Sequence, residues 1–435
     1  MTKKSPKFWL SLVILSLIGQ IAWVVENMYF NVFIYKMFNA SPSEISAMVM
    51  ASAVSATLTT LLIGALSDKV GKRKIFICGG YIAWGISILA FALVRVDILS
   101  AITSSTVAAA SLGITLTIIL DCVMTFFGST ANDACFNAWL TDSTDSTNRG
   151  AAEGINAMMP LVAILAVFGG FMGFDLSLAN SWTIIYIIIG AIVLIVGVVG
   201  IFIIDDGAVK REENGKYFSN IIYGFRPSVI KQNGLLYLCL IAFALFGISI
   251  QIFMPYLIIY YEVSLAMKDY VLIMAPAIVI ASVVTFFYGR LYDKIGFKKA
   301  VIPALIMLMT GYVVLCLFTN VVLVFIGSLL MMSGYLSGMA VFGAVIRDLT
   351  PEGKAGMFQG LRIVGQVLIP GLIGPAIGSM VLANADTFVN TDGTTSFIPN
   401  INIFIAALVV AVVLALFLIL LFTIMKKKEK KDNQQ

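Results

Sequence analysis

The sequence predicts an all-α membrane protein with twelve transmembrane helices, arranged as two related halves of six helices. Three observations predict this fold. The chain of 435 residues is 60% hydrophobic and only 12% charged, which is more apolar than a soluble protein requires. Apolar stretches of about 20 residues, the length of a helix that crosses a bilayer, recur along the whole chain. A short polar motif also occurs once in each half.

The apolar stretches divide the chain into twelve expected spans, with the only long polar interior stretch after the sixth. The spans are 8–35, 44–66, 75–95, about 112–140, 150–175, 181–204, 234–261, 268–291, 299–319, 321–346, 355–383 and 401–425. The expected domains are an N-terminal bundle (1–204), a central cytoplasmic loop (205–233), a C-terminal bundle (234–425) and a basic cytoplasmic tail (426–435).

The positions of the basic residues predict the orientation. When both termini are placed in the cytoplasm, 25 of the 28 Lys and Arg residues lie on that side, and only Lys36, Arg95 and Lys268 lie outside. This agrees with the enrichment of basic residues in cytoplasmic loops of membrane proteins. The net charge of +5 is therefore explained by topology, without a nucleic-acid partner. We expect a multi-pass protein of the cell membrane.

Residues 98–118 carry no charge and test the number of spans. A thirteenth span here would invert everything after it and place the basic 205–233 stretch outside the cell. The positions of the basic residues exclude that topology. We therefore expect an outer-surface segment that leads into a long fourth helix.

Neither cysteine nor histidine indicates a metal, redox or proton-transfer site. The five cysteines lie singly inside expected spans, without the spacing of a metal site or a redox motif. Histidine is absent, so no side chain titrates near neutrality unless its surroundings change it. We expect no cofactor and no metal, and any proton handling must use carboxylates.

The repeated motif reads Gly-x-x-x-Asp-Lys-x-Gly-x-(Lys/Arg). Its copies start at Gly64 and at Gly289, and each lies between two long apolar stretches. A second repeat relates Asp142, Gly150 and Gly154 to Asp348, Gly356 and Gly360. Repeats at such distances indicate that the two halves are related. The glycines permit a tight turn and a close approach of helices.

Twelve spans, a central loop and this motif after spans 2 and 8 resemble the major facilitator superfamily of secondary transporters, over essentially the whole chain. The resemblance implies two pseudo-symmetric six-helix bundles that alternate access to a central site, with helices 1, 4, 7 and 10 lining the cavity. It also implies a cytoplasmic gate, in which Asp68 faces the start of helix 11 and Asp293 faces the start of helix 5. A carboxylate gains stability at the positive amino end of a helix.

The residues assigned to this gate are Gly64, Asp68, Lys69, Gly71, Arg73, Asp142, Arg149, Gly289, Asp293, Lys294, Gly296, Asp348 and Arg362. The alternative is a basic loop that only fixes topology, with an aspartate that balances its charge.

Three acidic residues lie well inside the expected spans, away from the span ends. A charge at mid-bilayer costs about 2.5–3.5 kcal/mol, so each one calls for a function or a partner. Glu26 in span 1 and Asp121 in span 4 lie at similar depth, and Asp133 lies nearer the cytoplasm. Because the second half has no matching acids, we expect cation coupling by Glu26, Asp121 and Asp133 in the first half. The alternative is neutral or hydrogen-bonded groups that pack helices.

A polar face on helix 1 predicts substrate binding. Gln20, Trp23, Asn27 and Asn31 recur at spacings of three and four residues and so share one face. Amides beside an indole suit a hydroxylated ligand. The expected binding residues on the other cavity helices are Thr125, Asn132, Gln251, Tyr256 and Tyr335. Hydrogen bonds between helices are the alternative explanation.

Asp133-Ala-Cys-Phe136 with Asp142 and Arg149 resembles, over about 20 residues, the glycoside–pentoside–hexuronide cation symporters. Unlike their sodium-coupled members, span 2 holds no aspartate pair, which favours protons over sodium. The sequence therefore predicts a symporter of a sugar or glycoside. The expected partners are a sugar-like solute, a coupling proton or sodium ion and the lipid bilayer, and the chain is expected to act as a monomer.

Two other functions compete with sugar symport. A multidrug/proton antiporter also fits an acid in helix 1, but such antiporters normally carry a Gly-x-x-x-Gly-Pro-x-x-Gly element in helix 5. Here helix 5 lacks that proline, and a similar stretch, Gly371-Leu-Ile-Gly374-Pro375-Ala-Ile-Gly378, lies in span 11. A non-transporting sensor would need a larger soluble output segment than the tail provides. An enzyme is not expected, because the short loops carry no phosphate loop, metal cluster or nucleophile–base pair.

Overall fold

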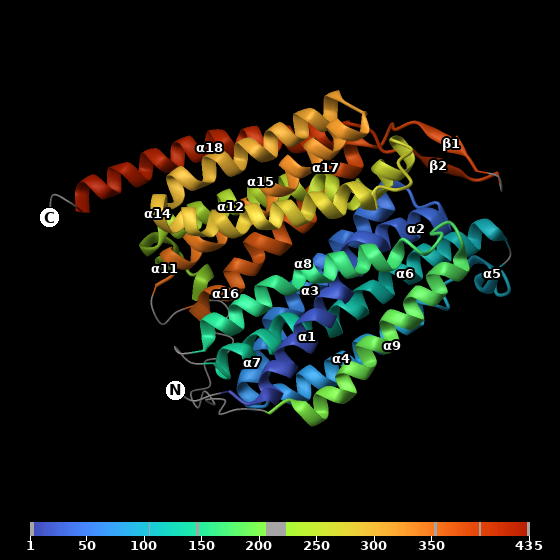
Figure 1. The fold of residues 1–435 in the computed structure, drawn as a ribbon, viewed down its shortest axis with the longest axis horizontal. Coiled ribbons are helices and arrows are strands. Elements are labelled where there is room, and N and C mark those ends of the chain that lie inside the picture. Colours follow the sequence, from blue (N-terminus) through green and yellow to red (C-terminus); the bar gives the residue numbers. More distant parts are fainter. Residues whose placement is uncertain are drawn as a thin grey trace. The chain divides into compact units, whose positions relative to one another are not determined.

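The structure is a computed structural model, shown in Figure 1. It describes residues 4–103, 105–144, 148–205, 223–351, 355–390 and 393–432. The chain divides into two compact units. The first comprises Met1–Tyr217 with Phe388–Ser396, and the second comprises Phe218–Thr387 with Phe397–Gln435. The bounds that we assign to the two bundles, the loop and the tail remain predictions.

In the residues that the structure describes, the first unit contains six long helical segments. The first runs through α1 (Pro6–Val24), a π-helical turn (Val25–Tyr29) and α2 (Phe30–Phe38). It is followed by α3 (Pro42–Val70), α4 (Arg73–Phe91), the short α5 (Val96–Leu99), α6 (Thr106–Gly128), a π-helical segment (Ser129–Phe136), α7 (Asn137–Asp142), α8 (Arg149–Phe171) and α9 (Ala179–Ile203). Within this unit α1 packs against α8, α3 against α6, and α4 against α9.

The sequence explains where α3 begins and ends. Ser41 caps its amino end by accepting a hydrogen bond from the Glu44 N–H, while the Glu44 carboxylate accepts one from the Ser41 N–H. Pro42 occupies the first turn, where no amide hydrogen is needed. At the other end Gly71 takes φ 71° and ψ 23°, a left-handed conformation that glycine adopts without strain. This is the tight turn that the repeated motif predicts.

The second unit repeats the pattern of long helices. Its helices are a 3-10 turn (Tyr223–Phe225), α11 (Pro227–Gln232), α12 (Gly234–Phe253), a 3-10 turn (Met254–Tyr256), α13 (Leu257–Ile259), a π-helical turn (Tyr260–Ser264), α14 (Val271–Leu317), α15 (Val321–Leu349), α16 (Ala355–Ile363), a π-helical turn (Val364–Leu368), α17 (Ile369–Val381) and α18 (Asn402–Asp432). The strands β1 (Thr387–Val389) and β2 (Thr395–Phe397) lie between α17 and α18 along the chain, and most of their residues belong to the first unit. Within the unit α14 packs against α15, and α12 packs against α17 and α18.

Among the described residues, 11 helices are long and apolar enough to cross a membrane. One of them, α14, has 47 residues, or about 70 Å at the rise of an α-helix, which is more than twice the thickness of a bilayer core. Its backbone breaks at Gly296, with φ 71° and ψ 173°. The two sides of this break match the expected spans 268–291 and 299–319, so the all-α fold with twelve helices is confirmed.

Two local features differ from the sequence-based expectation. The segment 98–118 is a surface segment only at its start, because α6 begins at Thr106, capped by the Ser105 hydroxyl. Residues 106–118 therefore belong to the fourth long helix. The strands β1 and β2 pair as a two-stranded sheet, which the apolar pattern did not predict. Asn390 in this hairpin donates to the Asn39 side-chain oxygen at 2.9 Å.

Candidate functional site: a buried acidic cluster in the first unit

Glu26 lies where the first long helix departs from α-helical geometry. It is the second residue of the π-helical turn Val25–Tyr29, in which the Phe30 N–H donates to the Val25 carbonyl, five residues earlier. Single π-helical turns inside α-helices are frequent at functional sites. The Glu26 side chain is only 7% exposed. A buried carboxylate needs hydrogen-bond donors, and neighbouring helices supply them.

Two hydroxyl groups bind one oxygen of Glu26. The Ser52 hydroxyl from α3 and the Thr125 hydroxyl from α6 each lie 2.8 Å from Glu26 Oε1. The two hydroxyl oxygens lie 2.9 Å from each other. The second carboxylate oxygen, Oε2, is buried and has no hydrogen-bond partner among the described residues. Three helices therefore converge on one end of this carboxylate and leave the other end available.

The structure brings Asp121 to the same cluster. Asp121 lies on α6, one helical turn before Thr125, and is 2% exposed. Its carboxyl group lies within electrostatic range of Glu26. Its Oδ1 atom is also buried without a partner among the described residues. Glu26 and Asp121 are thus two buried acids, each with one carboxyl oxygen that has no partner among the described residues.

Asp133 lies apart from this cluster. It belongs to the π-helical segment Ser129–Phe136, and its Oδ2 accepts a hydrogen bond of 2.9 Å from the Ser129 hydroxyl in the previous turn. Its charge acts on Glu26 at longer range. Glu26, Asp121 and Asp133 therefore form a pair and a separate single residue.

Some polar side chains of helix 1 form hydrogen bonds within the helix itself. The Asn27 amide donates to the Trp23 carbonyl at 2.8 Å, and the Asn31 amide donates to the Asn27 carbonyl at 3.2 Å. Asn27 is exposed, Gln20 is half-buried and Asn31 is buried, with its side-chain oxygen unpartnered among the residues described. The Trp23 ring lies 4.9 Å from that of Trp84 on α4. Neither indole N–H group has a hydrogen-bond partner among the described residues.

Asn132 has a structural role in this arrangement. Its amide donates to the Tyr81 hydroxyl at 2.9 Å, and Tyr81 donates to the Leu15 carbonyl at 2.6 Å. A Cβ atom at Gly19 would overlap the Asn132 amide nitrogen. Asn132 therefore ties helix 1 to α4 and the π-helical segment, which is the interhelical alternative considered from the sequence.

The expected binding residues of the second unit pack against its own helices. A Cβ atom at Gly374 on α17 would overlap the Gln251 Cβ, and one at Gly378 would lie 2.8 Å from the Tyr256 ring. Tyr256 is fully buried, whereas Gln251 and Tyr335 are half-buried. Gln251 and Tyr256 therefore both pack closely against α17.

The first copy of the repeated motif is held by an arginine. Arg73 at the start of α4 is 5% exposed. It forms an ion pair with Asp68 and a second one, at 3.1 Å, with Asp142 at the end of α7. It also donates to the Ser67 hydroxyl. Gly64 is less constrained, since a Cβ atom there would lie 3.8 Å from Ala134. Lys69 is exposed.

The second copy uses a different contact. Lys298 stands where the first copy has Arg73, and the Tyr292 hydroxyl donates to the Asp348 carboxylate. Gly296 forms the turn, and Gly289 has no atom within 4 Å of a Cβ position. Asp293 and Lys294 are exposed. The Arg362 guanidinium donates to Gln366 at 3.2 Å, and the Arg149 side chain lies outside the described part.

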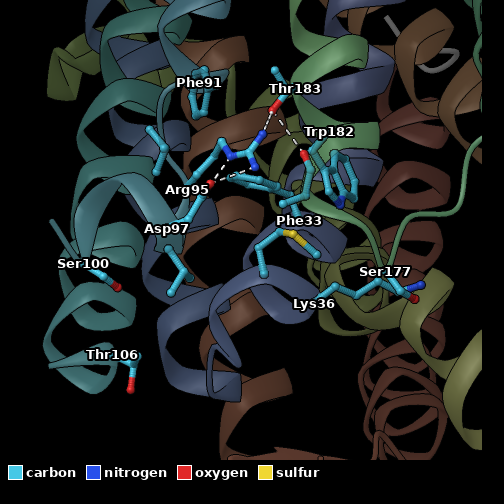
Figure 2. Close-up of a pocket in the computed structure, with 14 residues that line it drawn as sticks. Phe33, Lys36, Phe91, Arg95, Asp97, Ser100, Thr106, Ser177, Trp182 and Thr183 are labelled. Atoms are coloured by element: carbon cyan, nitrogen blue, oxygen red, sulfur yellow. Dashed lines mark hydrogen bonds and ion pairs between the residues drawn. The ribbon is translucent and has the colours of Figure 1, made fainter. Parts of the chain in front are cut away.

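A pocket of about 610 Å³ opens at the other end of the first unit, between α2, α4, α5 and α9. Figure 2 shows Arg95 at its centre, next to Asp97 and Thr183. Arg95 donates twice to Asp97 at 2.9 Å, and to Asn180 and Thr183. The Arg95 guanidinium lowers the pKa of the Asp97 carboxyl below its usual range. The Arg95 guanidinium is therefore already hydrogen-bonded to side chains in and next to the pocket.

Sequence reasoning missed four residues of these clusters. Ser52, Ser67, Trp84 and Tyr292 are ordinary residues for helices in a membrane, and only the fold shows what they contact. One signal was available for Ser52, because Ser52 and Ser55 lie three residues apart on a largely apolar helix and so share a face. A polar stripe of this kind indicates contact with other polar helices.

Comparisons with known proteins agree with this fold. The family model described as Major Facilitator Superfamily matches residues 8–285 and 271–435. No curated protein sequence matches the chain. Among solved structures, a bacterial homologue of the human lysosomal transporter Spinster, inward-facing and unoccupied, is similar at 16% identity with a TM-score of 0.68, covering 96% of this chain and 98% of that one.

The nucleoside transporter NupG is similar at 14% identity with a TM-score of 0.67, covering 95% of this chain and 98% of that one. These likenesses show the fold, and the family model shows the family. The chain belongs to the major facilitator superfamily, and it is accordingly a multi-pass membrane protein and a secondary transporter of a small-molecule substrate, not an enzyme.

Proposed function

We propose that this protein is a proton-coupled symporter of a sugar or glycoside, acting as a monomer in the cell membrane with both termini in the cytoplasm. The observation that carries the proposal is the pair of buried carboxylates, Glu26 and Asp121, which lie within electrostatic range of each other. Each keeps one oxygen that is unpartnered among the described residues. Two close carboxylates without a basic partner can hold one proton between them, as carboxyl pairs do elsewhere.

The arrangement supports a proton more than a sodium ion. Glu26 Oε1 already lies in contact with two hydroxyl groups, and no group of three or more acidic, cysteine or histidine side chains that could hold a metal ion exists among the described residues. The sequence has no histidine to carry the proton instead. The acids lie in one half, whereas the scaffold motif lies in both, which favours coupling in the first half.

A hydroxylated substrate is supported by the groups next to this pair. Within the described ranges, the unpartnered indole N–H groups of Trp23 and Trp84 are donors, and the unpartnered Asn31 side-chain oxygen is an acceptor. Hydrogen-bond donors and an acceptor beside aromatic side chains suit a substrate ring that carries hydroxyl groups, because ligand sites combine apolar walls with a few polar groups. NupG is a nucleoside transporter, and a nucleoside also carries a hydroxylated ring. The resemblance around Asp133 to glycoside–pentoside–hexuronide symporters points the same way.

The test is uptake into proteoliposomes that hold the purified protein. A panel of radiolabelled sugars and glycosides is offered with the outside more acidic than the lumen. We expect at least one of them to accumulate above its equilibrium level, and Glu26→Gln to abolish the accumulation. Glu153→Gln serves as the matched control, because Glu153 is an exposed glutamate of α8. Dye efflux that follows the gradient without any sugar uptake would instead support a multidrug/proton antiporter, and no transport would support a sensor.

A further inference from the structure

The pocket around Arg95 in Figure 2 lies where four membrane-crossing segments of the first unit begin or end. The segment Pro6–Phe38 ends next to it, α4 ends there at Phe91, α6 begins there at Thr106, and α9 begins there at Ala179. The ends of membrane helices lie at the level of the lipid headgroups. The cavity of about 610 Å³ has the size of a site for a small organic ligand.

The charges of the pocket favour an anion. The charged side chains that line it are Lys36, Arg95 and Asp97, two positive and one negative. Both oxygens of Asp97 accept N–H groups of Arg95, so these two charges balance and Lys36 leaves the pocket positive. The amino end of α9 reaches the pocket at Ser177 and Ala179. It adds to the positive potential, because the dipole of a helix is positive at its amino end.

Arg95 keeps a donor for such an anion. An arginine side chain has five N–H donors. The bonds to Asp97, Asn180 and Thr183 use four of them, which leaves one N–H on Nη2 for a further acceptor. The same bonds fix the position of the guanidinium, so little side-chain entropy is lost when a ligand binds. Arginine and lysine are the side chains that bind phosphate groups.

The walls of the pocket are aromatic, and apolar surface flanks it. Phe33, Phe91 and Trp182 are buried lining residues, and the rings of Phe33 and Trp182 lie 5.2 Å apart. Four large apolar side chains are exposed directly next to lining residues in the chain, namely Leu93, Ile98, Val107 and Leu178. A positively charged pocket is therefore flanked by surface that suits hydrocarbon.

We propose that this pocket binds the phosphate of a phospholipid headgroup through Lys36 and Arg95, while the flanking apolar side chains contact the acyl chains. A lipid fits better than a free anion, because it carries both the charge and the hydrocarbon that the two surfaces call for. Basic pockets between membrane helices bind lipid headgroups in this way. The inference goes beyond the proposed transport function, which gives this pocket no role.

The experiment uses a phosphatidylglycerol that carries a photoreactive diazirine in one acyl chain. The purified full-length protein in detergent is mixed with this lipid and illuminated, and peptide mass spectrometry measures the labels at Leu93, Ile98 and Val107. The wild type is expected to be labelled there. Lys36→Gln removes a charge-assisted contact with the phosphate and should lower the labelling by about tenfold, whereas Lys36→Arg keeps the charge and should stay close to the wild type.

Two further variants separate the pocket from general effects of charge. Ser177→Glu places a negative charge at an exposed lining residue without removing the side chain of Lys36 or Arg95, and should also lower the labelling. Lys268→Gln is the matched control, because Lys268 is exposed, does not line the pocket and is the third basic residue expected on the outer side. It should be labelled as the wild type is.

Competition distinguishes a lipid from a free phosphate. An excess of unlabelled phosphatidylglycerol should remove the labelling, and the same concentration of soluble glycerol phosphate should leave it unchanged. Removal by glycerol phosphate alone would show a site for free phosphate and overturn the lipid assignment. Equal labelling of Lys36→Gln and the wild type, or an equal loss in Lys36→Gln and Lys268→Gln, would overturn the pocket as the binding site.

Discussion

At the scale of single residues, the sequence reveals which charges lie in the membrane but not what binds them. Glu26 and Asp121 are visible in the sequence because acids inside apolar spans are costly. The partners of Glu26 are Ser52 and Thr125, whose hydroxyl groups are common in membrane helices and carry no distinct signal. Only the packing of α3 and α6 brings these hydroxyls to Glu26. The same holds for Asn132, which the sequence assigns to the substrate and the structure bonds to Tyr81.

Asp68 provides a prediction at this scale. Its carboxylate forms an ion pair with the buried Arg73, so Asp68→Lys places two positive charges next to each other. Because Arg73 also binds Asp142, we expect the turn between α3 and α4 to separate from the end of α7. If this turn belongs to the cytoplasmic gate, as we propose, a reporter cysteine that replaces the exposed Asn137 should react several-fold faster with a thiol reagent. The background is a variant without the five native cysteines.

Asp175→Lys is the control for this charge reversal, because Asp175 is exposed and lies beyond the other end of α8. Equal reaction rates in the two reversals would contradict a gating role of Asp68. A faster rate in both would point to a general effect of added positive charge.

At the scale of elements, periodicity and length predict the helices well and their contacts poorly. The twelve spans follow from apolar length, and the turn at Gly71 follows from the repeated motif. The early start of α6 at Thr106 was missed because Ser and Thr residues near 105 resemble a loop, although Ser105 is the helix cap. The π-helical turns at Val25–Tyr29 and Ser129–Phe136 leave no mark in the apolar pattern.

The contact between α4 and α9 yields a prediction with an internal control. A Cβ atom at Gly85 would lie 2.5 Å from the Leu194 backbone nitrogen, whereas a Cβ atom at Gly79 on the same helix would meet nothing within 4 Å. We expect Gly85→Ala to destabilise the protein by about 1–3 kcal/mol, since a backbone contact cannot yield easily. Gly79→Ala should be neutral or slightly stabilising, because alanine favours a helix.

Thermal unfolding in detergent, followed by tryptophan fluorescence or by solubility after heating, compares the two variants. Equal melting temperatures for Gly85→Ala and Gly79→Ala would show that α4 and α9 do not pack this closely.

At the scale of the whole molecule, the two halves share their scaffold and differ in their chemistry. Asp142 and Asp348 occupy matching positions of the second repeat, but one is bound by Arg73 and the other by Tyr292. The buried pair Glu26 and Asp121 has no counterpart in the sequence of the second half, where Gly327 corresponds to Asp121. The duplication predicts the family from sequence alone. The unmatched acids identify where coupling should lie, although their hydrogen bonds required the fold.

The most direct test of proton coupling compares two modes of transport in the Glu26→Gln variant, using the solute that the uptake panel identifies. Exchange of labelled for unlabelled solute across proteoliposomes needs binding and alternating access but no net movement of protons. We predict that Glu26→Gln keeps exchange near the wild-type rate and loses accumulation driven by a pH gradient. Accumulation that persists in this variant would contradict the assignment of the coupling proton to Glu26.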